Sequence, residues 1–235
     1  MASAQFLLEA GHPRVVGSFG SLLDLREATV ASVRESCDIA EVRLDLLFGT
    51  SESPPWGHLA EIPLLFTARR SEEGGAQALD AAARVALLRG VLDQAAWLDI
   101  EVASIPEMAG FLEELAARKI PWLASYHDFE KLPNTAVLAQ AAQHAKAAGA
   151  AVFKAAAQLA SPADVARLAE FQLADHGLPV ATMGMGPLAP VSRLLCAQCG
   201  SVLNYGYLGK TATAPGQWDS ALLQNAISRL APFRL

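Results

Sequence analysis

The polarity of the chain alternates between short apolar segments and longer stretches in which apolar residues recur at helical spacing. Short apolar runs bounded by turn residues are typical of buried strands, and longer stretches with a period of 3.6 residues are typical of helices. The pattern predicts strands at residues 14–19, 39–44, 64–68, 97–101, 122–127, 151–155, 179–183 and 202–205.

Helical patterns lie between these strands, at residues 22–36, 79–94, 105–118, 135–149 and 161–176. Two of them have clear start signals, because Asn134 and Ser161 are capping residues and Pro162 suits a first helical turn. Gly149 and Gly177 follow helical stretches, where a residue with positive φ often ends a helix. Strands and helices therefore alternate along the chain.

This alternation, with no linker between its units, indicates a parallel sheet. The length of 235 residues is close to the roughly 250 that a (β/α)8 barrel takes. We therefore predict a single α/β domain, residues 1–235, with the (β/α)8 TIM-barrel fold. No glycine-rich nucleotide-binding motif follows a strand. In such a barrel the chemistry lies at the C-terminal ends of the strands, and candidate residues are sought there.

Composition and charge limit the classes of partner that the protein can bind. Apolar residues make up 52% and charged residues 18% of the chain, which supports a large core and argues against disorder. The net charge is −6 at pH 7, whereas nucleic-acid binding needs a basic face. We predict no nucleic-acid partner, and we expect any anionic substrate to be held by a few local arginines.

Targeting signals and cysteines add little. Residues 1–12 lack the basic segment and long apolar run of a signal peptide, and no apolar stretch approaches the length of a membrane span. Cys37, Cys196 and Cys199 are too few for a disulfide framework, and the last two lack the second pair that would complete a zinc site. We predict a cytoplasmic protein without membrane association, in which Cys196 and Cys199 are unreactive thiols.

Charged and apolar residues alternate at the second predicted strand. A period of two places Glu41, Arg43 and Asp45 on one face of it. In a parallel barrel both faces are covered, so this face must point into the barrel mouth or be paired there. The segment indicates a polar site, with a structural layer of ion pairs as the alternative.

Polar residues also follow the third and fifth strands. Residues 67–75 bring two arginines, Arg69 and Arg70, and two acids, Glu72 and Glu73, to a strand end, although a solvated loop would have a similar composition. His127 ends the fifth strand, and histidine is the side chain most easily tuned for proton transfer near neutral pH. A lone histidine is more often structural, so His127 gains its weight from its neighbours.

Lys154 is the sharpest single signal, because it interrupts an otherwise apolar strand. Burial disfavours the ammonium form, lowers the pKa and makes the amine a nucleophile toward carbonyls. Elsewhere a lysine can extend to the surface and keep its charge in water, but a lysine that points into a barrel hardly can. Lys154 therefore predicts covalent chemistry.

Two further segments follow the last two strands. Arg193 comes after a turn rich in glycine and proline, in the first turns of a predicted helix, where a guanidinium can bind a carboxylate; a surface arginine is the alternative. Residues 210–217 form a polar loop that either closes over a ligand or only connects the eighth strand to the last helix.

Taken in order, these segments resemble the type I 3-dehydroquinate dehydratases. The matching motifs are E-x-R-x-D, F-T-x-R…E-G-G, S-x-H-D-F, F-K, M-G…S-R and A-P-G-Q, which together span nearly the whole chain. The resemblance implies a lyase of the shikimate pathway that converts 3-dehydroquinate to 3-dehydroshikimate through an imine on Lys154, without metal or bound cofactor. It also implies a homodimer, since family members are commonly dimers.

The same resemblance implies the role of each residue. His127 would remove a C2 proton and then help the C1 hydroxyl leave, and Glu73 would hold the imidazole; the family spacing excludes Glu72. Asp99 would support the site. The implied substrate contacts, with Arg193 on the carboxylate and the others on ring hydroxyls or from the closing loop, are Glu41, Arg43, Arg69, Arg193, Thr213 and Gln217.

The sequence departs from the family motifs at one position, and two alternative functions remain. The family loop reads S-A-P-G-Q, and Thr213 keeps the hydroxyl but adds a methyl group that affects the fit of the closed loop. A Schiff-base aldolase or transaldolase barrel would also carry a strand lysine, and product analysis separates it. A non-catalytic barrel that binds a polyhydroxylated acid is disfavoured, since Lys154 and His127 are both present; fold alone cannot decide.

Overall fold

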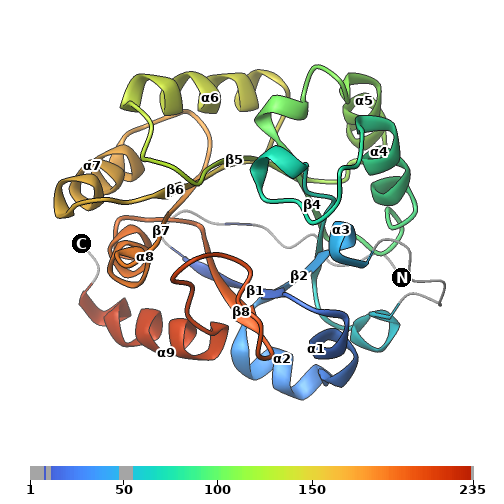
Figure 1. Cartoon of the computed structure of the whole chain (residues 1–235), viewed down its shortest axis with the longest axis horizontal. Coiled ribbons are helices and arrows are strands. Elements are labelled where there is room, and N and C mark those ends of the chain that lie inside the picture. Colours follow the sequence, from blue (N-terminus) through green and yellow to red (C-terminus); the bar gives the residue numbers. More distant parts are fainter. Residues whose placement is uncertain (1–7, 9–11, 48–54, 234–235) are drawn as a thin grey trace.

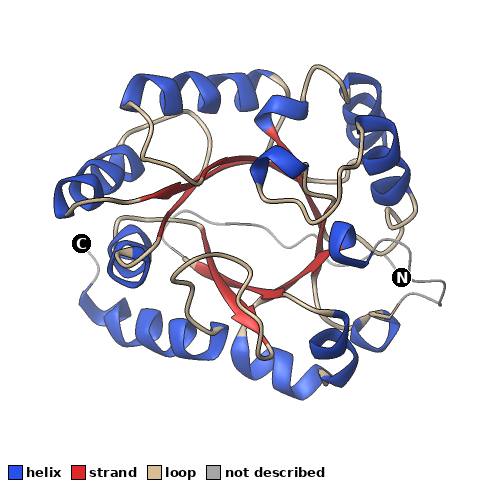
Figure 2. Cartoon of the chain, in the orientation of Figure 1, coloured by secondary structure: helices blue, strands red, loops and turns tan. Residues whose placement is uncertain are grey.

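A nearly closed ring of parallel strands lies at the centre of the molecule, with helices outside it (Figures 1 and 2). The computed structural model describes residues 8, 12–47 and 55–233. The strands neighbour one another in the order β7-β6-β5-β4-β3-β2-β1-β8. Their bounds are β1 Arg14–Phe19, β2 Ile39–Arg43, β3 Leu64–Thr67, β4 Trp97–Glu101, β5 Trp122–Asp128, β6 Val152–Gln158, β7 Val180–Met185 and β8 Leu203–Leu208. The predicted (β/α)8 barrel is confirmed.

The helices follow the strands in chain order. They are α1 Leu22–Glu27, α2 Val30–Ser36, α3 Leu44–Leu47, α4 Ala81–Arg89, α5 Ala109–Arg118, α6 Thr135–Ala147, α7 Pro162–Leu173, α8 Ala189–Gln198 and α9 Ser220–Leu230, with short 3-10 turns at Gly57–Leu59, Ser71–Glu73, Val102–Ser104 and Ala231–Phe233. The predicted capping residues Asn134 and Ser161 accept backbone N–H bonds at the starts of α6 and α7. Gly149 and Gly177 have positive φ, as predicted.

The prediction of one continuous first helix was wrong. Residues 22–36 form two helices, because Ala28 is extended at ψ 145° and Thr29 caps α2 with a reciprocal bond to Ser32. The helix predicted at 79–94 is also shorter, since Asp80 caps its start and it ends at Arg89. Local capping chemistry overrides the apolar period at these ends.

The second strand is shorter than predicted, which corrects the placement of Asp45. Strand β2 ends at Arg43, and Leu44 and Asp45 already belong to α3. Asp45 is therefore not on the strand face of Glu41 and Arg43. It reaches Arg43 from the helix instead, through bonds of 2.9 and 2.7 Å to the guanidinium.

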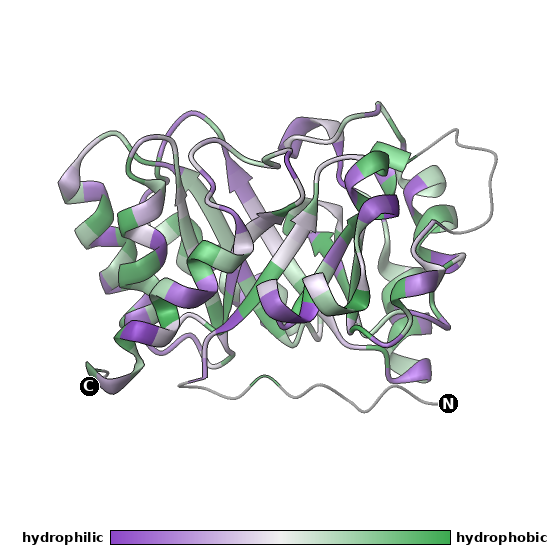
Figure 3. Ribbon diagram, turned by 90° about the horizontal axis from the view of Figure 1, so that it is seen from below, coloured by the Kyte–Doolittle hydropathy of each residue, from purple (hydrophilic) through white to green (hydrophobic). Residues whose placement is uncertain are grey.

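Strand alternation divides the barrel interior into layers. The lower layer is apolar, with side chains such as Val16, Leu65, Leu123 and Val152 in one buried cluster. Residues one pleat further along the same strands are polar. They include Ser18, Glu41, Thr67, Asp99, Ser125 and Lys154, all buried. The side view in Figure 3 shows the strand arrowheads pointing to the same rim.

Side chains help to join β7 and β8, the two strands at the ends of the sheet order. One backbone bond crosses there, from Val202 N–H to the Val180 carbonyl at 3.2 Å. The Thr182 N–H donates to Ser201 Oγ at 3.3 Å, and the Arg193 guanidinium donates to the Tyr205 carbonyl. The helix α8 that carries Arg193 is thus tied to this seam.

Residues 1–7 and 9–11, on which the predicted lack of a signal peptide rests, lie outside the described residues. Among the residues that the structure describes, no helix is long and apolar enough to cross a membrane.

Candidate active site

A pocket opens at the C-terminal ends of the strands. Ser18, Phe129, Met183, Met185 and Tyr205 are among the residues that line it. Every residue that the sequence analysis proposed as catalytic or substrate-binding lines this pocket: Glu41, Arg43, Arg69, Glu73, His127, Lys154, Arg193, Thr213 and Gln217. The fold therefore brings together residues that are spread over most of the chain.

Lys154 points into the barrel from the middle of β6 and is only 3% exposed. Its Nζ lies 2.6 Å from Oδ2 of Asp99 and 4.3 Å from the centroid of the Tyr205 ring. Burial lowers the pKa of Lys154, and the nearby positive charge of Arg69 lowers it further, while Asp99 acts in the opposite direction. The site thus contains an amine that loses its proton more easily than an exposed lysine does.

Asp99 is held as a carboxylate by its neighbours. Arg69 Nη2 donates to Oδ2 at 2.8 Å, and the Ser125 hydroxyl donates to Oδ1 at 2.5 Å. Burial by itself would raise the pKa of Asp99, but the charges of Arg69 and Lys154 lower it overall. The carboxylate is therefore a fixed negative charge beside the amine.

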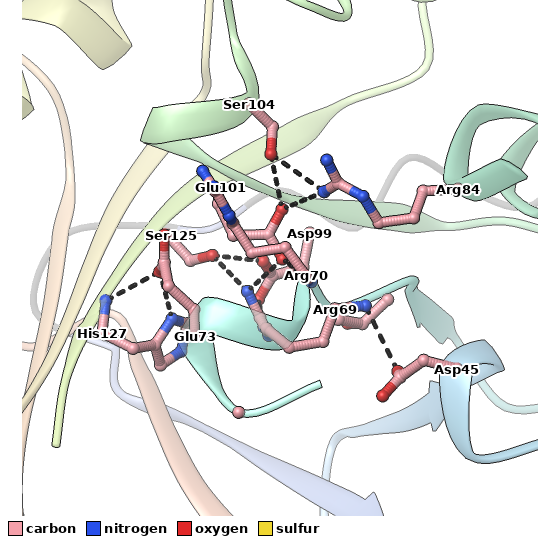
Figure 4. Close-up of polar contacts among 12 residues, drawn as sticks. Asp45, Arg69, Arg70, Glu73, Arg84, Asp99, Glu101, Ser104, Ser125 and His127 are labelled. Carbon is pink, nitrogen blue, oxygen red and sulfur yellow. Dashed lines mark hydrogen bonds and ion pairs between the residues drawn. The ribbon is translucent and has the colours of Figure 1, made fainter. Parts of the chain in front are cut away.

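His127 and Glu73 form a second pair in the pocket, and each side chain is 10% exposed (Figure 4). Glu73 Oε2 lies 2.9 Å from His127 Nδ1 and 2.9 Å from the His127 backbone N–H. A carboxylate at Nδ1 favours the tautomer that leaves Nε2 free to accept a proton. Burial and the charges of Arg69 and Lys154 lower the pKa of His127, and burial raises that of Glu73 to about 7.

Local backbone geometry selects Glu73 over Glu72. Both belong to the 3-10 turn Ser71–Glu73, which ends at Gly74 with φ 86°. A Cβ on Gly74 would lie 2.7 Å from the Phe129 ring, so a glycine is needed here on both counts. The turn directs Glu73 to His127 and leaves Glu72 paired with Arg70 at 3.1 Å, outside the pocket.

The second strand contributes Glu41 and Arg43. Thr67 Oγ1 donates to Glu41 at 2.7 Å, and the Ser18 hydroxyl donates to its other oxygen. Arg43 is paired with Asp45 and also donates to the Gly74 carbonyl at 3.1 Å. The two interpretations that the sequence offered, a polar site and a layer of ion pairs, both apply here. Arg43 forms an ion pair with Asp45 and still lines the pocket.

Arg193 is placed more deeply than the sequence suggested. It lies in the second turn of α8 and is 2% exposed, so neither the surface alternative nor a position at the rim describes it. Within the described ranges its Nε has no hydrogen-bond partner, and its Nη1 donates to the Tyr205 carbonyl and the Met183 sulfur rather than to a carboxylate. Burial lowers its pKa to about 10. A buried cation that faces a pocket without a counter-ion is suited to an anionic ligand.

The loop after β8 lies across the pocket mouth. The Thr213 hydroxyl and backbone N–H both donate to Gln217 Oε1, at 2.8 and 3.0 Å. The Gly186 N–H, from the turn after β7, donates to the Pro215 carbonyl at 3.1 Å. The two residues predicted from this loop therefore form one hydrogen-bonded unit above the site.

Comparisons with known proteins agree with this arrangement. A model of the type I 3-dehydroquinase family matches residues 19–231. The chain is 35% identical to a 3-dehydroquinate dehydratase of Desulfotalea psychrophila over 211 residues, which is 86% of this chain and 92% of that protein. It is 31% identical to a 3-dehydroquinate dehydratase of Methanothrix thermoacetophila over 215 residues, 92% of this chain and 91% of that protein.

The chain belongs to the type I 3-dehydroquinase family. The crystal structure of 3-dehydroquinate dehydratase from Geobacillus kaustophilus has the same fold, with a TM-score of 0.82 and 24% identity over 95% of this chain and 93% of that one. The family and the lyase activity predicted from the sequence are confirmed.

Some residues of this type I 3-dehydroquinase site were missed or underrated. Asp99 was predicted only to support the site, yet it touches the Lys154 amine. Glu101 follows it at the same period of two that drew attention to Glu41 and Arg43, so a signal was available. Tyr205 packs under Lys154, and nothing in its apolar strand distinguishes it.

The cysteines lie elsewhere in this type I 3-dehydroquinase. Cys37 and Cys196 are buried, and burial raises the pKa of each to about 12. Burial also raises the pKa of the half-buried Cys199. No described residue group has three or more metal-ligating side chains placed to hold an ion.

Proposed function

We propose that the chain dehydrates 3-dehydroquinate to 3-dehydroshikimate through an imine between Lys154 and the C3 ketone, with His127 as general acid and base. The observation that carries this proposal is the pairing of a buried amine with a histidine–carboxylate pair in one pocket. Family membership and the dehydratase activity of the relatives supply the substrate.

Lys154 supplies the nucleophile. Its amine adds to the C3 carbonyl, and loss of water gives an iminium ion, in which the nitrogen has replaced the ketone oxygen. Asp99, 2.6 Å from Nζ, is placed to stabilise that cation. The iminium withdraws electrons from C2, so a C2 proton becomes acidic without a metal or bound cofactor.

His127 then moves protons. The neutral imidazole removes the C2 proton, and the electron pair left behind forms an enamine. The C1 hydroxyl leaves as water when the imidazolium returns the proton, and the resulting conjugated iminium is hydrolysed to release the enone and the Lys154 amine. Glu73 holds the ring in one orientation and stabilises its charged form.

The remaining pocket residues bind and order the substrate. Arg193 donates to its carboxylate, because this guanidinium is buried without an acidic partner in the described structure. Glu41 and Arg43 meet ring hydroxyls, and Thr213 and Gln217 close over them. Arg69 already donates to three acceptors around Lys154, so its part is to order the site and set its charge.

The family context extends the proposal beyond the site. We propose that the reaction belongs to the shikimate pathway. We also propose that the enzyme is cytoplasmic, acts as a homodimer and needs neither metal nor bound cofactor. These statements rest on the resemblance of the chain to its relatives.

The test is to follow the ultraviolet absorbance of the conjugated enone while the protein is incubated with 3-dehydroquinate. Borohydride added during turnover should reduce the imine to a stable adduct, which peptide mapping should place on Lys154. His127→Ala should still form this adduct while turnover falls about 10²-fold or more. An adduct on another residue, no adduct, or near-normal turnover in His127→Ala would contradict the mechanism.

A further inference from the structure

Arg84 is a buried arginine that lies outside the active-site pocket. It belongs to α4, in the outer layer of helices, and is 2% exposed. Its Nη1 donates to Glu101 Oε2 and to Ser104 Oγ, both at 2.9 Å, and its Nη2 is bonded to Glu107. It does not line the pocket, and the proposed mechanism does not use it.

Glu101 links Arg84 to the site, as Figure 4 shows. One Glu101 oxygen accepts from Arg84 and Ser104, and the other accepts from Arg69 Nη1 at 3.0 Å and the Arg70 N–H at 3.1 Å. Arg69 in turn donates to Asp99, which accepts from Lys154. A continuous series of buried ionic hydrogen bonds therefore runs from the helix layer to the reactive amine.

The charges in this series balance only when Arg84 is included. Asp99 and Glu101 carry two negative charges, and Arg69 alone offsets one of them. With Arg84 present the four groups are neutral in sum, so no further positive charge is needed on Lys154. Without Arg84 the buried series keeps one unbalanced negative charge, which favours the ammonium form of Lys154.

Other charged groups around the series do not replace Arg84. Glu107 is the outer partner of Arg84, and its side chain is 43% exposed, so water screens its charge. Arg43 is already paired with Asp45. The titratable and charged groups that face Lys154, Glu73 and His127 from the surrounding elements include Glu41, Arg43, Arg69, Asp99, Glu101 and Tyr205, and Arg193 lines the same pocket.

We propose that Arg84 is a positioning residue for the dehydration. Arg84 neutralises Glu101 from outside the pocket and so keeps Lys154 available as a free amine. The inference rests on the proposed imine mechanism. A purely structural Arg84 would only anchor α4 to the barrel, and its loss would lower stability without changing how activity depends on pH.

The experiment compares pH profiles of kcat/KM for the wild type and Arg84→Gln. Loss of this positive charge stabilises every protonated form nearby, so the acid limb should move to higher pH by about half a unit or more. Borohydride trapping on Lys154, measured at a pH on that limb, should slow several-fold. Arg84→Lys keeps the charge and should leave the limb close to its wild-type position.

Two further variants sharpen the result. Arg89→Gln is the matched control, because Arg89 is on the same helix but forms an exposed pair with Glu114; its profile should be unchanged. Glu101→Gln removes a negative charge and should move the limb in the opposite direction, to lower pH. This second measurement tests the proposal even if Arg84→Gln does not fold.

Several outcomes would overturn the inference. A folded Arg84→Gln with the wild-type profile would do so, as would Arg84→Lys shifting the limb as far as Arg84→Gln. A Glu101→Gln limb that stays in place or moves upward would also refute it. If the wild type forms no adduct on Lys154, the imine mechanism itself fails. If the wild type forms the adduct but Arg84→Gln leaves the acid limb unchanged, only the inference about Arg84 fails.

Discussion

Arg193 illustrates how much the role of one side chain depends on its depth. The sequence placed it correctly in an early turn of α8, but not in the buried position that it occupies. A buried charge without a counter-ion costs stability, and such groups are retained mainly where function requires them. The depth of Arg193 therefore strengthens its assignment as the carboxylate-binding residue.

Arg193→Lys should damage substrate binding although it keeps the positive charge. A guanidinium can meet both carboxylate oxygens through parallel hydrogen bonds, whereas an ammonium is a point charge on a shorter stem. A charge-assisted hydrogen bond contributes roughly 1.5–3 kcal/mol, so KM should rise about tenfold or more, with a lower kcat as the ring is misplaced. Steady-state kinetics measure both constants.

The control for this variant is its thermal unfolding. Arg193 also donates to the Tyr205 carbonyl at the β7–β8 seam, so a loss of activity must be separated from a loss of structure. Kinetics are therefore read at a temperature at which the variant is fully folded. Unchanged KM and kcat in that state would mean that another cation binds the carboxylate.

At the scale of elements, the strand ends present the proposed catalytic groups, and the loops complete the pocket around them. Strand β4 alone supplies Asp99 and Glu101 by simple alternation. The loop after β8 follows no such period, and its conformation depends on contacts such as that between Gly186 and Pro215. Loop residues such as Thr213 are therefore where a chain can depart from its family without altering the barrel.

Thr213→Val should weaken substrate binding more than Thr213→Ser does. Valine has nearly the same shape but cannot donate to Gln217 Oε1, whereas serine keeps the hydroxyl that now bonds there at 2.8 Å. A neutral hydrogen bond contributes roughly 0.5–1.5 kcal/mol, so KM for Thr213→Val should rise about two- to tenfold. Equal KM values for the two variants would show that the hydroxyl has no part in closing the loop.

At the scale of the whole molecule, the barrel brings acidic and basic groups from several strands into one interior layer. The carboxylates of this layer are engaged by hydroxyl groups, by arginines or by Lys154, as for Glu41, Asp99 and Glu101. Carboxylates engaged in this way are poorly placed to bind a divalent cation.

Activity should therefore survive exhaustive chelation. The protein would be dialysed against a strong chelator, its metal content measured, and its turnover of 3-dehydroquinate compared with that of an untreated sample. The expected ratio is close to one, because the proposed iminium itself withdraws the electrons. Chelator-sensitive turnover that a divalent ion restores would refute the cofactor-free mechanism.

The sequence by itself determined the order of the elements and the membership of the site. Period-two alternation and short apolar runs predicted the strands, and barrel geometry then directed attention to their C-terminal ends. Lys154 was visible because a charge within an apolar strand is unusual, and the resemblance to the family implied Glu73 in place of Glu72. These signals are local, so a linear pattern carries them.

Only the tertiary structure decided which of these groups touch one another. Asp99 and Lys154 are 55 residues apart in the chain, yet Lys154 Nζ lies 2.6 Å from Asp99 Oδ2, because β4 and β6 lie on either side of β5 in the barrel. Arg84 resembles any helical arginine until the fold buries it beside Glu101. Burial and pairing set the pKa values of such groups, and both depend on strand curvature and helix packing, which no local pattern encodes.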